Sequence, residues 1–169
     1  MPRFIKRASK KAGMPPGSLV HVGEKKQEHT RISVMDYEGD RFREQHPDDV
    51  ETVFPLREAP ATSWINIDGV HDMAVIEKLG QHFLIHPLTL EDTVNTAQRP
   101  KIEEFEDYIY VVFKMLQYDE AAAKVQTEQV SLVLGQHFLI SFQEAEGDVF
   151  CSGADLKGLM GGGLEGGST

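Results

Sequence analysis

Apolar and polar residues alternate along several short segments, and this alternation predicts β-strands. Residues 31–37 alternate between polar and apolar residues, as a half-buried strand does. Residues 64–68 predict a second strand that Gly69 ends, and residues 19–22 predict a shorter one. Residues 108–116 are almost continuously apolar and β-branched or aromatic. That pattern is typical of a strand covered on both faces.

Helical spacing appears between these strands. Asp72 stands in a good N-cap position before a predicted amphipathic helix of about three turns. Pro87 fits the first position of a second helix that ends near Asn95, because the missing N–H costs nothing there. Residues 41–57 predict at best a helix interrupted by prolines. The apolar residues at spacings of three and four in the first helix are Met73, Ile76, Leu79 and Phe83.

The last predicted elements form a hairpin. Residues 129–134 and 137–142 flank Gly135-Gln136, which indicates a type II′ turn. Strands that alternate with helices and then continue as a meander predict an α/β fold. We therefore expect a mixed, largely antiparallel sheet flanked by helices.

Composition divides the chain into three parts. Residues 1–17 form a basic arm that we expect to be flexible, and it ends in a Pro-Pro-Gly turn. Residues 18–150 form one α/β domain, and 169 residues suffice for a sizeable core. Residues 151–169 are glycine-rich and cannot bury enough apolar surface to order themselves. We read this tail as flexible and as a candidate for non-native sequence.

Charge and hydropathy limit the kinds of partner that the chain is expected to bind. The chain has a net charge of −10, although its first 26 residues are basic. An acidic body repels nucleic acid and concentrates cations, so no nucleic-acid partner is expected. No apolar run approaches the roughly 20 residues of a membrane helix, and no signal peptide is visible. We expect a soluble, cytoplasmic piece. Its one cysteine, Cys151, allows neither an internal disulfide nor a cysteine-based zinc site.

The candidate chemistry lies on the second predicted helix. Glu91 and Asp92 are adjacent there, so their side chains diverge by about 100° and cannot both face one ion. A magnesium site uses one or two carboxylates and keeps several waters. One carboxylate here and one from another chain would meet that need. The alternative is a solvated acidic helix face.

Motifs for catalysis are missing from the sequence. No Gly-x-Ser-x-Gly segment, usable Cys–His pair or glycine-rich phosphate loop occurs. We therefore do not expect an enzyme, although a site assembled from distant residues would leave no short motif. A deep pocket with convergent polar groups would favour that alternative.

The chain as a whole resembles the N-terminal cytoplasmic domain of CorA-type magnesium and cobalt transporters. The matching segments follow the family's order from about residue 13 to residue 150. They are Pro15-Pro16-Gly17, Trp64-Ile65-Asn66-Ile67, Gly69 with His71, His86-Pro87-Leu88 with Leu90-Glu91-Asp92, Gln98-Arg99-Pro100-Lys101, Phe113-Lys114-Met115, Glu128-Gln129-Val130-Ser131-Leu132, Phe142-Gln143-Glu144 and Gly147-Asp148-Val149-Phe150.

This resemblance implies a fold and a regulatory role. It implies an α/β/α sandwich at the cytoplasmic face of the membrane, in a homopentamer whose stalk and two membrane helices follow. It further implies that Mg²⁺ or Co²⁺ is both the transported and the regulatory ion, and that binding between neighbouring cytosolic domains holds the channel closed. The family's metal-binding aspartate falls on Asp92, with Glu91 as a secondary ligand and a partner carboxylate from the next subunit's stalk. After Phe150 the sequence departs from the family, so the membrane spans, stalk and Gly-Met-Asn signature are absent.

Two other interpretations stay open. The chain could belong to a zinc-transporting relative, or it could be a free-standing soluble binding module with the same fold. The sensing role also sets a condition. Asp92 must not be tied to a lysine or arginine of its own chain with no room for a hydrated ion.

Overall fold

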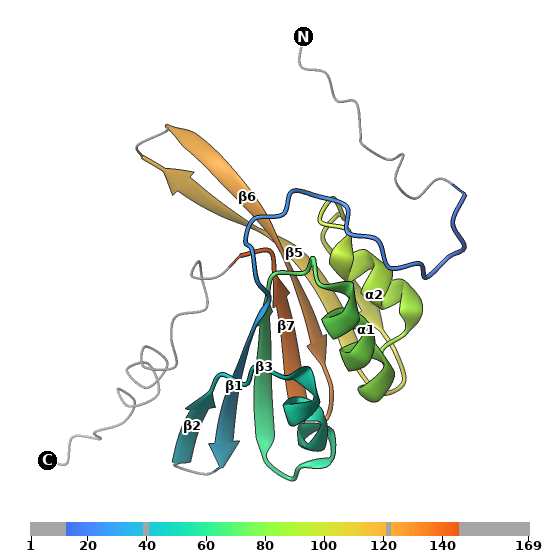
Figure 1. Ribbon diagram of the computed structural model, residues 1–169, viewed down its shortest axis with the longest axis vertical. Coiled ribbons are helices and arrows are strands. Elements are labelled where there is room, and N and C mark those ends of the chain that lie inside the picture. Colours follow the sequence, from blue (N-terminus) through green and yellow to red (C-terminus); the bar gives the residue numbers. More distant parts are fainter. Residues whose placement is uncertain (1–12, 39–40, 121–122, 146–169) are drawn as a thin grey trace, which may run out of the picture.

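A seven-stranded mixed sheet forms the centre of the protein (Figure 1). The computed structural model describes residues 13–38, 41–120 and 123–145. The strand order is β2-β1-β3-β7-β6-β5-β4; β3 and β7 are parallel and every other neighbouring pair is antiparallel. The predicted α/β fold class is therefore confirmed. The strands are β1 (Arg31–Glu38), β2 (Arg41–Gln45), β3 (Thr62–Asp68), β4 (Lys101–Glu104), β5 (Ile109–Asp119), β6 (Lys124–Leu134) and β7 (Phe138–Gln143).

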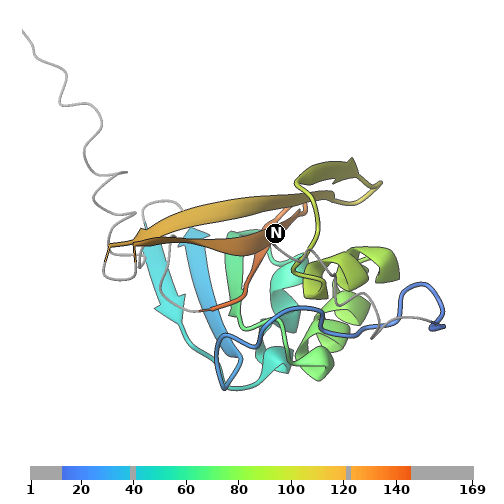
Figure 2. The same ribbon diagram turned by 90° about the horizontal axis from the view of Figure 1, so that it is seen from above.

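Helices α1 (Met73–His82) and α2 (Pro87–Val94) lie together on one side of the sheet (Figure 2). The Asp72 carboxylate accepts hydrogen bonds from the backbone N–H groups of Ala74 and Val75, which confirms the predicted N-cap. Pro87 occupies the first turn of α2, as predicted, and His86 caps that helix through its ring nitrogen. Local sequence signals thus determine where both helices begin.

The core fills the space between the sheet and these helices. Side chains from the strands meet Ile76 and Leu79 of α1 and Val94 of α2, all fully buried. Each fully buried methylene contributes roughly 0.8 kcal/mol, so this layer supplies most of the stability. Its strand members include Ile65, Ile67, Tyr110, Val112, Val133, Ile140 and Phe142.

Two predicted elements differ from the structure. The broken helix predicted over residues 41–57 is wrong: it is strand β2 followed by a 3₁₀ helix, η2 (Val50–Glu58). Pairing with β1 overrides the weak local preference of β2, and Pro55 inside η2 cannot donate an α-helical hydrogen bond. The strand predicted at residues 19–22 is a single bridge from Val22 to Asn95.

The predicted hairpin between β6 and β7 exists, but its turn differs in detail. Leu134 pairs with Leu139, and the backbone N–H of Gly135 donates to the carbonyl of Phe138 at 2.9 Å. Gly135 does not take the positive φ that a type II′ turn requires. It is needed for space, because a Cβ atom there would collide with the Phe138 ring.

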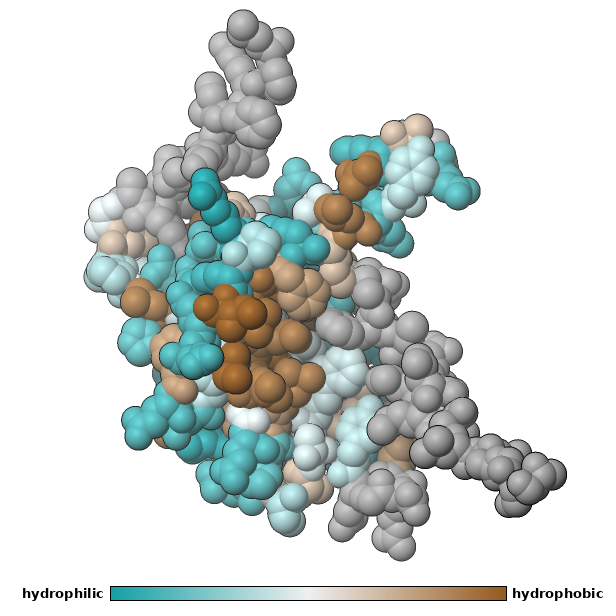
Figure 3. All heavy atoms as spheres, turned by 180° about the vertical axis from the view of Figure 1, so that it is seen from behind, coloured by the Kyte–Doolittle hydropathy of each residue, from teal (hydrophilic) through white to brown (hydrophobic). Residues whose placement is uncertain are grey.

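The opposite face of the sheet has no helix over it within the described residues. Figure 3 shows hydrophobic side chains gathered at the centre of this face. Ile102 and Val111 pair there across β4 and β5, and Leu134 and Leu139 pair across β6 and β7. Ile109 of β5 is 38% exposed on this face, so the double coverage predicted for β5 is not present in the part of the chain described.

Candidate metal centre

Helix α2 directs its two carboxylates to different neighbours. Glu91 points towards the segment before β1, whereas Asp92 points towards the start of β4. This divergence agrees with the 100° step of a helix. The two acidic residues therefore form two separate polar sites rather than one.

The Asp92 carboxylate lies at the centre of a small polar cluster. Its Oδ2 atom accepts a hydrogen bond from Lys101 Nζ at 2.5 Å, and its Oδ1 atom accepts one from the Gln98 side-chain amide. The side chains of Asp92 and Lys101 are 23% and 27% exposed, so solvent still reaches the pair. Lys101 also contacts Glu103 at 2.9 Å. One lysine thus pairs with two carboxylates, which together still carry one more negative charge than it can balance.

Lys101 is held firmly in its charged form. Partial burial lowers its pKa, but hydrogen bonds to Asp92 and Glu103 outweigh burial and leave the pKa above its ordinary value. Its ammonium group also lies 5.5 Å from the centre of the Tyr110 ring. The site therefore keeps a positive charge at the place where a divalent cation would have to approach Asp92.

Gln129 connects this cluster to the centre of the sheet. Its amide nitrogen donates to the backbone carbonyl of Asp92 at 3.2 Å, and its amide oxygen accepts from the backbone N–H of Gln98. That same oxygen accepts from Lys114 Nζ at 2.9 Å. Burial lowers the pKa of Lys114, against the opposing effect of Glu144. These bonds fix the loop after α2 and hence the position of Gln98 beside Asp92.

Glu91 is bound to the N-terminal segment. Its Oε2 atom accepts a hydrogen bond from the backbone N–H of Gly17 at 2.7 Å. The turn predicted at Pro15-Pro16-Gly17 is present, with the N–H of Ser18 donating to the Pro15 carbonyl. Gly17 takes a φ of +83°, and a Cβ atom added there would lie 3.0 Å from Cβ of Pro87. Glycine therefore permits this close approach to α2.

A complete metal site is not formed by the residues that the structure describes. Among them, no group of three or more histidine, cysteine, aspartate or glutamate side chains is placed to hold an ion. A carboxylate has about four lone-pair positions, so Asp92 can supply one ligand oxygen. Of the two parts of the condition set by the sequence, one fails in this conformation, because Lys101 of the same chain occupies Asp92, while solvent still reaches the pair. Metal binding there requires Lys101 to move.

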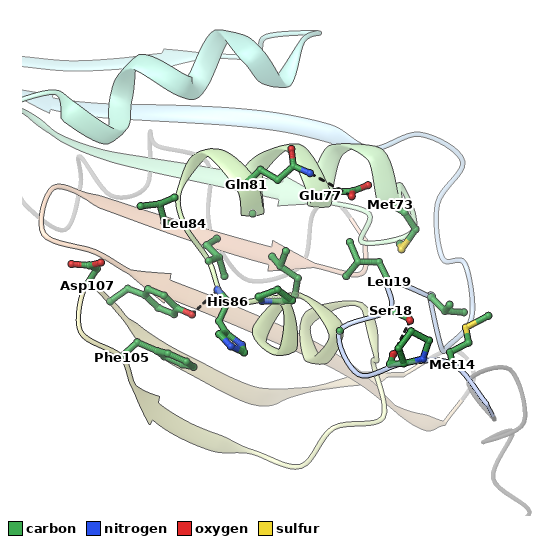
Figure 4. A pocket seen from close by; sticks show the side chains of 18 of the residues that line it. Met14, Ser18, Leu19, Met73, Glu77, Gln81, Leu84, His86, Phe105 and Asp107 are labelled. Carbon is green, nitrogen blue, oxygen red and sulfur yellow. Dashed lines mark hydrogen bonds between the residues drawn. The ribbon is translucent and has the colours of Figure 1, made fainter.

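A groove with a volume of about 1150 Å³ lies beside the first turn of α2 (Figure 4). It runs between the N-terminal segment, α1, α2 and the turn before β5. Its lining is largely apolar and includes Met14, Leu84 and Phe105, together with the ring of His86. Glu91 and Asp92 do not line it. Some of its polar side chains bond to one another or to nearby backbone, as Gln81 does to Glu77 and Tyr108 to the N–H of His86.

Comparison with known proteins decides the family. The family model described as CorA-like Mg²⁺ transporter protein matches residues 60–152. The chain belongs to this family. The cobalt/magnesium transport protein CorA of Thermotoga maritima is 48% identical over 145 residues, which are 86% of this chain and 41% of that protein. The chain thus spans less than half the length of this CorA relative.

Two solved structures show the same fold. The complete CorA magnesium transporter of Methanocaldococcus jannaschii has a TM-score of 0.51 at 16% identity, over 77% of this chain and 36% of that one. The cytoplasmic domain of ZntB from Vibrio parahaemolyticus has a TM-score of 0.55 at 13% identity, over 71% and 46%. Among the described residues, no helix is long and apolar enough to cross a bilayer.

Sequence reasoning missed the partners of the two acidic residues. The sequence assigns no role to Lys101, Gln98 or Gly17, although all three lie in segments that resemble the CorA family and the first two lie within the matched residues 60–152. Their position in those segments was the available signal. A predicted helix followed by a predicted strand does not indicate that Lys101 contacts Asp92, because that contact depends on the pairing of β4 with β5.

Proposed function

We propose that this chain is the cytosolic, divalent-cation-sensing part of a CorA-type magnesium and cobalt transporter. Asp92 is the half of a regulatory site that this chain supplies, and Glu91, which accepts a hydrogen bond from Gly17 in this conformation, is a secondary ligand. A carboxylate of a neighbouring protomer in a homopentamer completes the site. The observation that supports this most strongly is the 48% identity to the Thermotoga cobalt/magnesium transport protein over nearly the whole chain.

Lys101 gives this proposal a mechanism. An approaching Mg²⁺ repels the ammonium group, so the ion and Lys101 compete for Asp92. Without the partner carboxylate, the binding free energy from Asp92 alone is too small to displace Lys101 and to replace waters in the hydration shell of the ion. We therefore expect affinity no tighter than the millimolar range for this chain by itself. A second carboxylate would favour Mg²⁺ over Lys101 in the competition for Asp92. Binding would then depend on the arrangement of neighbouring protomers.

Linkage makes this dependence reciprocal. If a particular arrangement of protomers favours the ion, then the ion favours that arrangement by the same free energy. Bound Mg²⁺ would hold the closed arrangement, and its loss would release it. In this way intracellular Mg²⁺ would limit its own entry.

The uncovered face of the sheet fits a place within a longer protein. The exposed apolar side chains of this face lie on β4 and β6, whereas the central parallel pair of β3 and β7 is almost entirely buried already. Chain that follows this domain in longer relatives would cover Ile102 and Leu134, which are 70% and 48% exposed. The transporter's stalk and membrane spans would follow the same point.

A zinc-transporting relative is the second candidate, favoured by the likeness to the ZntB cytoplasmic domain, and a free-standing binding module with this fold is the third. The reading frame beyond Phe150 separates the module from the transporters. Two apolar spans with a Gly-Met-Asn signature would favour a transporter, and their absence would favour the module.

Ion uptake by the full-length transporter that includes this domain tests the sensing role. Asp92→Asn there should weaken the inhibition of uptake by internal Mg²⁺, because the amide cannot neutralise the ion. Asp107→Asn, in an exposed turn, serves as the matched control. If uptake by the Asp92 variant stays as strongly inhibited as that of the wild type, Asp92 is not the sensor.

A further inference from the structure

The outer halves of β5 and β6 project beyond the rest of the sheet as a two-stranded ribbon (Figure 1). We use "the ribbon" for residues 115–119 and 124–128, which pair only with each other within the described chain. β4 accompanies β5 no further than Val112, and β7 accompanies β6 no further than Ser131. An isolated hairpin is marginally stable in water, so a projecting one is a candidate for pairing with another strand.

One side of the ribbon is apolar and exposed. Leu116 and Tyr118 of β5 are 71% and 61% exposed, and Val125 of β6, directly opposite Tyr118, is 54% exposed. Alternation along the strand puts all three on one side. The ribbon therefore combines an open strand edge with an apolar surface, and both features favour strand addition.

The two edges of the ribbon are not equally accessible. Lys26 Nζ donates to the carbonyl of Thr127 at 3.2 Å, so the N-terminal segment contacts the β6 edge. Glu128 accepts hydrogen bonds from the backbone N–H groups of Glu144 and Ala145 at the same edge. The β5 edge from Met115 to Asp119 is thus the better site for a new strand.

The sequence of the β5 edge is complementary to itself. An antiparallel pairing centred on Gln117 would place Leu116 opposite the partner subunit's Tyr118, and Tyr118 opposite the partner's Leu116. Aromatic–aliphatic cross-strand pairs of this kind are stabilising. Met115 would face the partner's Asp119, so no two like charges meet. A two-fold contact repeats each pair, which doubles every favourable contact.

We propose that two copies of this chain associate through the β5 edge of the ribbon. The product is a four-stranded sheet in the order β6-β5-β5-β6, with Leu116, Tyr118 and Val125 of both copies on one side. A two-fold contact cannot close a ring of five. This association is therefore separate from the proposed pentamer, and removing Mg²⁺ should not affect it.

Analytical ultracentrifugation of the whole chain over a concentration series gives the first test. The mass should rise towards twice the 18.9 kDa monomer as concentration increases. Leu116→Lys should abolish the rise, because it buries a charge at each end of the contact. Ile102→Lys, on the open face of the sheet, should leave it unchanged. A chain that stays monomeric, or a dimer lost only in the Ile102 variant, would overturn the proposal. Circular dichroism checks that both variants fold.

Disulfide cross-linking gives a second, geometric test. In a Cys151→Ser background, Gln117→Cys should form a dimer on mild oxidation, because paired Cα atoms lie about 4.5–5.5 Å apart and disulfides span about 4.4–6.8 Å. Gln126→Cys is the matched control, since Gln126 lies directly opposite Gln117 on the same ribbon. Cross-linking at 117 but not at 126 supports the proposal. Cross-linking at 126 only, at both equally, or at neither overturns it.

Discussion

The two faces of the sheet share one pattern of alternating side chains but differ in what covers them. On the face beneath α1 and α2, Ile65, Tyr110 and Ile140 have no exposed surface. On the other face, Ile102 and Leu134 are 70% and 48% exposed. Hydrophobic strands alone thus do not make a closed core. The difference teaches that the covered face stabilises this domain, while the other face leaves apolar side chains of β4 and β6 exposed within the described residues.

Substitution on each face should give the largest contrast. Ile65→Ala removes buried methyl groups between the sheet and the helices and should lower the free energy of unfolding by about 2–5 kcal/mol. Leu134→Ala, on the half-exposed face, should cost about 1 kcal/mol or less. Urea unfolding followed by circular dichroism measures both. Equal losses would mean that the two faces are equally covered in solution.

Ionisation of Tyr110, on the covered face, should give the next largest effect on the free energy of unfolding. Burial raises the pKa of Tyr110 from 10.0 to about 12, although hydrogen bonds with Ser131 and Thr93 oppose the rise. The folded chain therefore keeps a proton that the unfolded chain releases. This contribution to stability is fully present below pH 10 and is lost as the pH rises towards 12.

The expected loss for Tyr110 is on the order of 2 kcal/mol, at roughly 1.4 kcal/mol for each pKa unit. Urea unfolding at pH 9 and pH 11.5 measures it. Tyr110→Phe should reduce the difference between the two pH values, while Tyr118→Phe, on the exposed ribbon, should not. If Tyr110→Phe keeps the full wild-type pH dependence, the buried Tyr110 hydroxyl is not its cause.

The cap of α1 should give a smaller effect. Asp72→Ala removes two hydrogen bonds to the first turn of the helix that covers the sheet. The free energy of unfolding should fall by about 1 kcal/mol. Asp107→Ala, in the exposed turn between β4 and β5, is the control and should change it little. A fall of the same size in both variants would point to overall charge rather than capping.

The sequence predicted best those parts of the fold that depend on local chemistry. Asp72 and Pro87 begin their helices where expected, and alternation locates β1 and β3. Strand β2 was missed because its residues are mostly polar and its structure depends on pairing with β1. The open face was also missed, since a continuous apolar run in β5 does not reveal whether anything covers its second side.

For the candidate site, the sequence indicated the acidic residues but not their surroundings. Asp92 and Glu91 lie on α2 as expected, and they diverge as a helix requires. The ion pair with Lys101 joins residues on different elements, so only the assembled fold reveals it. That pair changes the proposed site from a free acidic flank to one that must exchange its own lysine for a metal ion.

Magnesium titration of this chain, followed by calorimetry, tests the account most directly. The wild type should bind Mg²⁺ no tighter than the millimolar range, and Asp92→Asn should bind more weakly still. Lys101→Gln should bind more tightly, because it removes the competing charge from Asp92. Lys78→Gln removes the same charge from an exposed pair with Glu51 and should leave affinity nearly unchanged. Micromolar binding by the wild type, or equal binding by the wild type, Asp92→Asn and Lys101→Gln, would contradict the account.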